Sequence, residues 1–214
     1  MPHKFYSSID FPDPRQTQAE GLIAVGGRLD VGTLYTAYSA GIFPWPQEGY
    51  PLLWFSPEKR GILEFKDFHV PESLRRFRRH HPELQFTLNG DTQQVIEECA
   101  KQPRPGQEGT WILPAMKRAY LEFARAGFVI SVEVLENNIV IGGIYGVLVE
   151  GLFSGESMFF KKPNASKLAL WRLVELLQGQ GHEWMDIQMV TPVLASFGGK
   201  YVEREVFLEM KSKL

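Results

Sequence analysis

The chain has 214 residues, of which 44% are hydrophobic and 13% aromatic, with a formal net charge of −2 and a single cysteine, Cys99. These values are typical of a globular protein and exclude a disulfide framework, a low-complexity chain and a generic polyanion binder. The longest apolar run, within residues 139–149, contains glycines and is too short to cross a bilayer. Because the amino terminus also lacks an apolar signal segment, we expect a cytoplasmic protein with no membrane partner.

Residues 1–62 are expected to form a small amino-terminal domain, and residues 63–214 a larger second domain. The first segment is rich in proline, glycine and aromatic residues, and it contains one clear helix that Asp30 caps and Gly41 ends. Two aromatic and proline clusters follow, at 41–45 and 52–57. Tryptophans on such rigid turns either pack one domain on the other or line a ligand cleft. Core packing is favoured for Trp54, whereas both interpretations stay open for Trp45.

The chain changes character after residue 68. A short helix is predicted over residues 72–81, followed by a strand at 85–88, a helix at 93–101 that Asp91 caps, and a long helix between 114 and 127. The first of these helices is unusual because it carries four arginines in five positions: Arg75, Arg76, Arg78 and Arg79. Such a charge run is most simply a solvated face, but on a slightly acidic protein it also suggests contact with a phosphate backbone.

The carboxyl-terminal half predicts a mixed sheet. Strands at 129–135 and from 139 onward meet in a hairpin, and a second hairpin turns at Gly151. Asn164 is a suitable N-cap for a helix that runs to residues 179–181, and the strand at 184–189 completes a βαβ unit. A short helix at 193–197 and an edge strand at 200–205 follow. This order is that of the Gcn5-related acyltransferase fold, so we expect the α/β class.

Three polar residues lie where ligands bind to such sheets. Asp186 and Gln188 are two apart on one strand and share a face, roughly 6.6 Å apart, and Glu156 lies in the preceding strand. A carboxylate in so apolar a segment needs a partner or a function. The alternative is that Glu156 pairs with a buried lysine or arginine while Asp186 and Gln188 face water. Their convergence at one end of the sheet favours a functional site.

Several kinds of chemistry find no support in the sequence. The turn at 161–167 lacks the glycines that would admit a coenzyme A pyrophosphate, and neither Ser154 nor Ser157 lies in a Gly-x-Ser-x-Gly motif. Cys99 has no neighbouring base in the sequence, and the five histidines lack the spacing of a zinc site. We therefore expect no metal and no cofactor, and direct transfer between two bound substrates.

Six short blocks carry a resemblance to a known family. They are Gly-Ile-Phe-Pro-Trp (41–45), Trp-Phe-Ser-Pro (54–57), Gly-Thr-Trp-Ile (109–112), Gly-Glu-Ser-Met-Phe (155–159), Asn-Ala-Ser-Lys (164–167) and Asp-Ile-Gln (186–188). In this order they closely resemble the bacterial leucyl/phenylalanyl-tRNA–protein transferases. The resemblance implies a small amino-terminal domain and an acyltransferase-like domain in which a charged tRNA replaces acetyl-coenzyme A. It also implies that Asp186 and Gln188 are the catalytic pair and Glu156 the site carboxylate.

The implied activity transfers leucine or phenylalanine, and methionine less well, from leucyl-tRNA or phenylalanyl-tRNA to proteins that begin with arginine or lysine. The transferred residue marks the acceptor for degradation. Two features depart from the family pattern: Val193 stands where a histidine is expected, and the chain ends soon after its last predicted strand.

The donor's remaining contacts are predicted from residue type. An apolar amino acid needs a dry pocket, and Trp45 and Trp111 are candidates to stack on the terminal adenine of the tRNA. The apolar residues of the central unit closest to the expected site are Ile144, Phe153, Met158, Leu170 and Ile187. We expect a monomer. Two alternatives stay open: a peptidoglycan-type aminoacyl-tRNA transferase, which usually has two such domains, and a non-catalytic tRNA-binding module.

Overall fold

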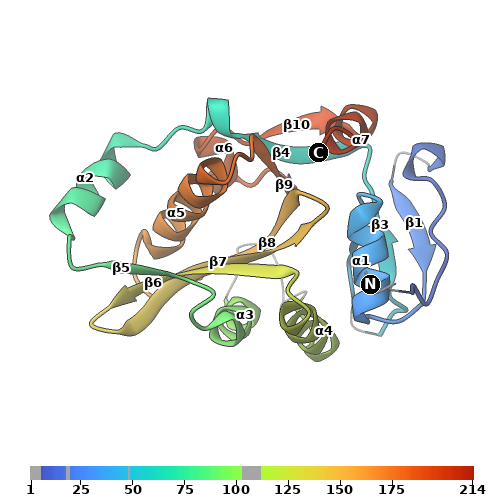
Figure 1. Ribbon diagram of the computed structural model, residues 1–214, viewed down its shortest axis with the longest axis horizontal. Helices are drawn as coiled ribbons and strands as arrows, with labels where there is room; N and C mark the ends of the chain where they lie inside the picture. Colours follow the sequence, from blue (N-terminus) through green and yellow to red (C-terminus); the bar gives the residue numbers. More distant parts are fainter. Residues whose placement is uncertain (1–5, 18–19, 48, 103–111) are drawn as a thin grey trace.

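A computed structural model describes residues 6–17, 20–47, 49–102 and 112–214. Its strands form two sheets, one of three strands in the order β1-β3-β2 and one of seven in the order β10-β4-β9-β8-β7-β6-β5 (Figure 1). The small sheet contains β1 (Leu22–Val25), β2 (Phe43–Pro44) and β3 (Leu53–Phe55). The large sheet contains β4 (Lys59–Glu64), β5 (Gln85–Leu88), β6 (Val129–Glu136), β7 (Ile139–Val149), β8 (Leu152–Phe160), β9 (Trp184–Gln188) and β10 (Lys200–Glu203).

The small sheet packs with α1 (Val31–Ser39), and a short 3₁₀ helix (Pro14–Gln16) precedes it. Asp30 caps α1 as predicted, because its carboxylate accepts a hydrogen bond from the N–H of Thr33 at 2.8 Å. Trp54 is fully buried, and its Nε1 donates to the carbonyl oxygen of Gly26 at 2.9 Å. The core-packing interpretation of Trp54 is therefore confirmed.

The large sheet is mixed, as the sequence predicted. Every pairing is antiparallel except that of β8 with β9, which is parallel and is connected by α5 (Ala165–Gly179). The predicted βαβ unit and the α/β class are thus confirmed. Asn164 holds the N-cap position of α5, but its φ is +70° and its side chain makes no capping hydrogen bond. Its role there is to turn the chain in the left-handed conformation that asparagine tolerates.

Helices cover both faces of the large sheet. In Figure 1, α5 lies on one face, and α3 (Thr92–Lys101) and α4 (Pro114–Arg125) lie on the other. The helix α2 (Glu72–His80) lies beside α5 at the β5 end of the sheet, whereas α1 lies at the opposite end of the molecule. One apolar core joins α1, α3 and α4, and another joins α5 to the sheet. The short 3₁₀ helix Phe65–Asp67 follows β4, and α6 (Pro192–Ser196) follows β9.

The carboxyl-terminal end differs from the prediction in one respect. The expected edge strand at 200–205 ends at Glu203, and the next residue begins α7 (Arg204–Lys211), which the sequence analysis missed. Phe207 and Leu208 of this helix pack in a third apolar cluster with Ile62 of β4 and Trp184 of β9. These contacts bury one face of the helix, and packing of this kind is what stabilises so short a helix.

The position of β4 bears on the domain boundary. This strand lies between β9 and β10 in the large sheet, so a division after residue 62 would cut it. We propose instead that the second domain begins at Lys59. Among the described helices, none combines the length and apolar character needed to cross a membrane.

Candidate active site

The two strands of the βαβ unit, β8 and β9, diverge, and Glu156, Asp186 and Gln188 lie where they separate. β8 and β9 form a ladder contact only between Ser154 and Asp186. On its other side, β8 contains a bulge: Tyr145 pairs with Ser157 while Gly146 pairs with Gly155, which leaves Glu156 as the extra residue. Bulges of this kind redirect a side chain. Here the bulge directs Glu156 toward α1 and α4, away from the face that packs on α5.

Glu156 receives three hydrogen bonds from side chains. Tyr38 of α1 donates to its Oε1 at 2.7 Å, Tyr120 of α4 to its Oε2 at 2.8 Å, and Nε2 of Gln188 to Oε1 at 3.2 Å. Burial raises the pKa of Glu156 to about 7, although the tyrosine hydroxyls oppose this rise; the charge of Asp186 adds to it and that of Arg60 opposes it. Because Glu156 stays partly exposed, it is a titratable group near neutral pH that a ligand can reach.

The two tyrosines are themselves strongly perturbed. Tyr38 and Tyr120 are buried, and their hydroxyl oxygens lie 2.5 Å apart. Burial, together with the nearby charge of Glu156, raises the pKa of both well above 10. They therefore stay protonated and act as hydrogen-bond donors to the carboxylate.

Asp186 lies in a different environment, because it has an arginine partner. Arg60 of β4 donates from Nε and one terminal nitrogen to the two carboxylate oxygens of Asp186, at 2.8 and 2.7 Å. Both side chains are fully buried, with exposed fractions of 1% and 0%. Breaking such a pair by removing one partner costs about 3–5 kcal/mol, since a charge is left uncompensated. The alternative in which Glu156 pairs with a buried lysine or arginine and Asp186 faces water is therefore wrong, because the buried arginine pairs with Asp186.

Gln188 ends β9 in a conformation that is unusual for a residue with a side chain. Its φ is +50°, and the N–H of Met189 donates to the carbonyl oxygen of Ile187 at 2.5 Å, so the chain turns within three residues. Such strain costs on the order of 1–3 kcal/mol and persists where neighbouring contacts enforce it. The N–H of Gln188 donates to Asp186 Oδ1 at 2.9 Å. On the facing strand, a Cβ added to Gly61 would lie 3.1 Å from main-chain atoms of Gln188.

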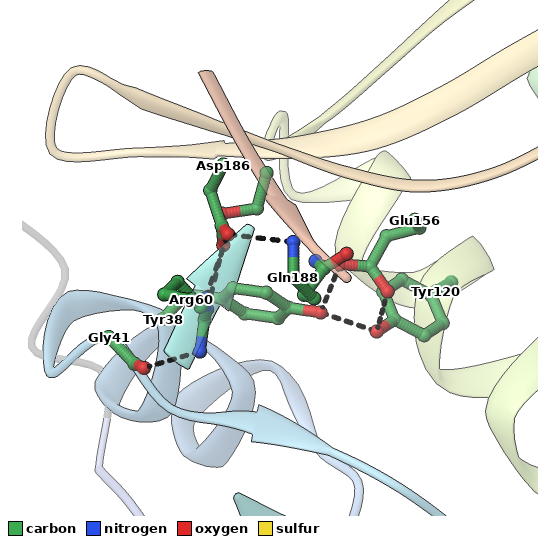
Figure 2. Close-up of polar contacts among 8 residues, drawn as sticks. Tyr38, Gly41, Arg60, Tyr120, Glu156, Asp186 and Gln188 are labelled. Carbon is green, nitrogen blue, oxygen red and sulfur yellow. Dashed lines mark hydrogen bonds and ion pairs between the residues drawn. The ribbon is translucent and has the colours of Figure 1, made fainter. Parts of the chain in front are cut away.

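Together these contacts close a circuit of hydrogen bonds, which we call the polar ring (Figure 2). Tyr38, near the end of α1, donates a hydrogen bond to Glu156, and the side chain of Gln188 donates another to the same carboxylate. The main-chain N–H of Gln188 in turn donates to Asp186. Asp186 accepts hydrogen bonds from Arg60, whose other terminal nitrogen donates to the carbonyl oxygen of Gly41 at 3.2 Å. The N–H of Gly41 donates to the carbonyl oxygen of Tyr38 at 3.1 Å, so the ring begins and ends on α1. The structure thus brings the three predicted polar residues together.

The five predicted apolar pocket residues lie on the other side of the sheet. Ile144, Phe153, Met158, Leu170 and Ile187 all belong to the core that contains α5. Four of them are at most 5% exposed, and only Met158 is partly exposed. Their assignment to a pocket stays a prediction.

The predicted nucleic-acid contacts are scattered. Trp45 is partly buried and its ring lies edge-on to Phe43 at 6.5 Å between ring centres, while Trp111 lies outside the described residues. On α2, Arg78 is paired with Glu175 at 2.9 Å and covers the ring of Trp171. The exposed arginines of this helix are Arg75, Arg76 and Arg79, the last of which pairs with Glu72. They lie far from the polar ring along the sheet (Figure 1).

Sequence reasoning missed three members of the site. Tyr38 and Tyr120 lie on two of the predicted helices, but neither they nor Arg60 was predicted to belong to the site. For Arg60, the signal in the sequence was its position at the start of the apolar run at 60–63, where a charged side chain needs a partner. For the tyrosines, the signal was a hydroxyl on a face that is otherwise apolar, which needs a buried partner. Within the described ranges, no group of three or more histidine, cysteine, aspartate or glutamate side chains could hold a metal ion.

Comparison with known proteins gives a consistent result. The model of a family described as leucyl/phenylalanyl-tRNA protein transferase matches residues 62–212, and that of its N-terminal domain matches residues 27–58. A leucyl/phenylalanyl-tRNA–protein transferase of Oleidesulfovibrio alaskensis is 44% identical over 206 residues, covering 94% of this chain and 83% of that protein. Another from Desulfatibacillum aliphaticivorans is 45% identical over 203 residues, covering 95% and 87%.

Solved structures are less similar. A C-terminal domain (DUF2156) from Agrobacterium fabrum, ascribed to a lysylphosphatidylglycerol synthetase, is 13% identical with a TM-score of 0.48, covering 79% of this chain and 62% of that one. A GCN5-related N-acetyltransferase-like protein from Streptococcus suis is 12% identical with a TM-score of 0.40, covering 68% and 57%.

Proposed function

The chain belongs to the leucyl/phenylalanyl-tRNA–protein transferase family, and we propose that the polar ring is where it transfers an aminoacyl group from tRNA to a protein. The donor is leucyl-tRNA or phenylalanyl-tRNA, with methionine used less well. The acceptor is a protein with amino-terminal arginine or lysine, which the added residue marks for degradation. Because charged tRNA is a cytoplasmic molecule, the enzyme acts in the cytoplasm, and it acts as a monomer.

One observation carries the proposal: Glu156, Asp186 and Gln188 meet where β8 and β9 diverge. A transfer site needs room for two substrates and polar groups that act on the bond between them. β8 and β9 pair at one position only, and beyond it Glu156 and Gln188 supply the polar groups. A non-catalytic tRNA-binding module would not need a partly exposed carboxyl with a pKa of about 7.

The reaction is aminolysis of an ester. The acceptor's α-amino nitrogen attacks the carbonyl carbon of the donor, a C–N bond forms, and the C–O bond to the terminal ribose breaks. The nitrogen loses a proton, and the ribose oxygen gains one. Gln188 directs its Nε2 to Glu156, which leaves its amide oxygen to accept a hydrogen bond from the attacking amine. An amide oxygen so placed orients the amine and stabilises the positive charge that develops on nitrogen.

Glu156 has two uses that its geometry supports. As a carboxylate it attracts the positive charge of a substrate, either the α-ammonium group of the donor's amino acid or the basic side chain of the acceptor. Because its pKa is about 7, the same group also exchanges a proton readily at neutral pH. Tyr38 and Tyr120 fix its orientation, since each donates to one of its oxygens.

The donor's side chain enters the α5 side of the sheet beside Met158. Of the five apolar residues assigned to this pocket, Met158 alone is partly exposed, and a flexible thioether adapts to both leucine and phenylalanine. A β-branched substrate would be rejected near the ester. The terminal adenine stacks on Trp45 and Trp111, and exposed arginines of α2 contact the tRNA backbone. Arg78 and Arg79 contribute less than Arg75 and Arg76, because Glu175 and Glu72 already pair with them.

A transfer assay with tRNA labelled on its amino acid tests the proposal. The acceptor is a peptide that begins with arginine, and the matched control is the same peptide with its α-amino group acetylated. We expect label in the first peptide only, and more of it from leucyl-tRNA and phenylalanyl-tRNA than from valyl-tRNA. Binding of charged tRNA without any labelled peptide would indicate a binding module. Label in a peptidoglycan precursor instead would indicate the other transferase class.

A further inference from the structure

We propose that Arg60 is a positioning residue for the transfer reaction, and that it acts on Gln188 through the carboxylate of Asp186. The inference rests on the proposed function, because it concerns the same site. It assigns Asp186 a main-chain role in place of direct proton transfer.

The carboxylate of Asp186 has no capacity left for a substrate. It accepts hydrogen bonds from Nε and a terminal nitrogen of Arg60, from Oγ of Ser154 at 2.9 Å and from the N–H of Gln188 at 2.9 Å. It is also fully buried. Four donors, two of them from Arg60, already occupy this buried carboxylate, so an attacking amine cannot hydrogen-bond to it directly. Its remaining effect on the reaction passes through the main chain of Gln188.

Arg60 is itself fixed from three directions. Its third nitrogen donates to the carbonyl oxygen of Gly41 just beyond the end of α1. Its guanidinium carbon lies 4.6 Å from the ring centre of Phe43 and 4.6 Å from that of Phe207. A planar guanidinium can stack between two rings while it bonds two carboxylate oxygens, and an ammonium cannot. The geometry thus requires arginine and not merely a positive charge.

The group positioned by this arrangement is the side chain of Gln188. Its positive φ is a strained conformation, and the bond from its N–H to Asp186 is one of the contacts that hold it. If Asp186 moves, the turn relaxes and the amide loses its orientation toward Glu156. Gly61 supports the same turn from the facing strand, where any Cβ would crowd the main chain of Gln188 and Met189.

Transfer kinetics test the proposal with two variants and one control. Arg60→Lys keeps the charge but loses the bidentate and stacked geometry, and Gly61→Ala displaces Gln188 while leaving the ion pair in place. Both should lower the single-turnover rate at saturating charged tRNA by about tenfold or more, with the Michaelis constants for tRNA and peptide nearly unchanged. The control is Glu133→Gln, which alters a buried carboxylate bonded to Thr87 and Ser131, outside the polar ring. If Arg60→Lys loses no more rate than Glu133→Gln at equal loss of stability, Arg60 is merely structural and the proposal is wrong.

A spectroscopic measurement separates this inference from the function on which it rests. The amide proton of Gln188 bonds a charged carboxylate, so its NMR resonance should be displaced downfield. Arg60→Lys should move this resonance upfield and speed its exchange with solvent, whereas Glu133→Gln should leave it in place. An unmoved resonance in Arg60→Lys overturns the positioning role, whatever the activity. If the resonance moves but the unaltered chain labels no peptide, the proposed function fails and the coupling of Arg60 to Gln188 stands.

Discussion

Replacing Glu156 with glutamine is expected to stabilise the protein above neutral pH, because the buried carboxylate costs folding free energy. Burial raises the pKa of Glu156 from 4.5 to about 7 in the folded state. Between these two values the folded protein binds a proton that the unfolded chain does not bind. The stability that this proton contributes is complete below about pH 4.5 and is lost as the pH rises through about 7.

The size of the effect follows from the pKa difference. One pKa unit corresponds to about 1.4 kcal/mol, so the carboxylate costs about 3 kcal/mol at most once it is ionised. Because Glu156 is partly exposed, screening by water reduces this value, and we expect about 1–3 kcal/mol at pH 8. For a chain of this size, that corresponds to an increase in Tm of about 3–10 °C. At pH 5 the native side chain is already neutral, so glutamine should change little.

Denaturant unfolding of the native protein and Glu156→Gln at pH 5 and pH 8 measures this difference. The matched control is Glu209→Gln, which neutralises an exposed carboxylate on α7. We expect the gain in free energy of unfolding to appear at pH 8 only, and only in Glu156→Gln. An equal gain at both pH values, or a loss at pH 8, would refute the reasoning about burial.

Three further predictions concern activity. Asp186→Ala and Gln188→Ala should each lower the single-turnover transfer rate by at least about tenfold with charged-tRNA affinity little changed, and the double variant should lose much less than the product. Near-normal rates in Asp186→Ala would remove it from the site. Reversing Arg75 and Arg76 to glutamate should raise the Michaelis constant for charged tRNA and lower the slope of log affinity against log salt by roughly 0.7–0.9 per lost phosphate contact. Equal losses on a short aminoacyl-nucleoside would contradict that contact. Trp45→Ala should weaken binding of the same nucleoside by about 1–3 kcal/mol. Unchanged affinity would leave Trp45 a packing residue.

Local patterns in the sequence were sufficient to predict most of the fold. The strand at 85–88 and the cap at Asp30 were predicted at their observed positions, because period-two alternation and capping chemistry act over a few residues. The helix α7 was missed because residues 204–205 were assigned to the preceding edge strand, and these charged residues carry no apolar periodicity of their own. Its helical character depends on Phe207 packing against Trp184, a contact between elements that sequence periodicity does not contain.

The site was predicted only where its members are close in the chain. Asp186 and Gln188 are two residues apart, and Glu156 is joined to them by one crossover helix, so strand topology brings them together. Arg60 and Tyr38 come from segments far away along the chain, and no short-range pattern places them beside Asp186 and Glu156. The bulge that redirects Glu156 was also invisible, because it depends on the register of β8 against β7.

The place of β4 between β9 and β10 has a consequence for the order of synthesis. Arg60 leaves the ribosome well before its carboxylate partner Asp186, which lies 126 residues later in the chain. Until then, β4 has two unpaired edges and its arginine has no counter-charge, so this part of the sheet cannot close before β9 is available. A nascent chain therefore cannot bring Gln188 and Glu156 together before β9 and β10 have emerged.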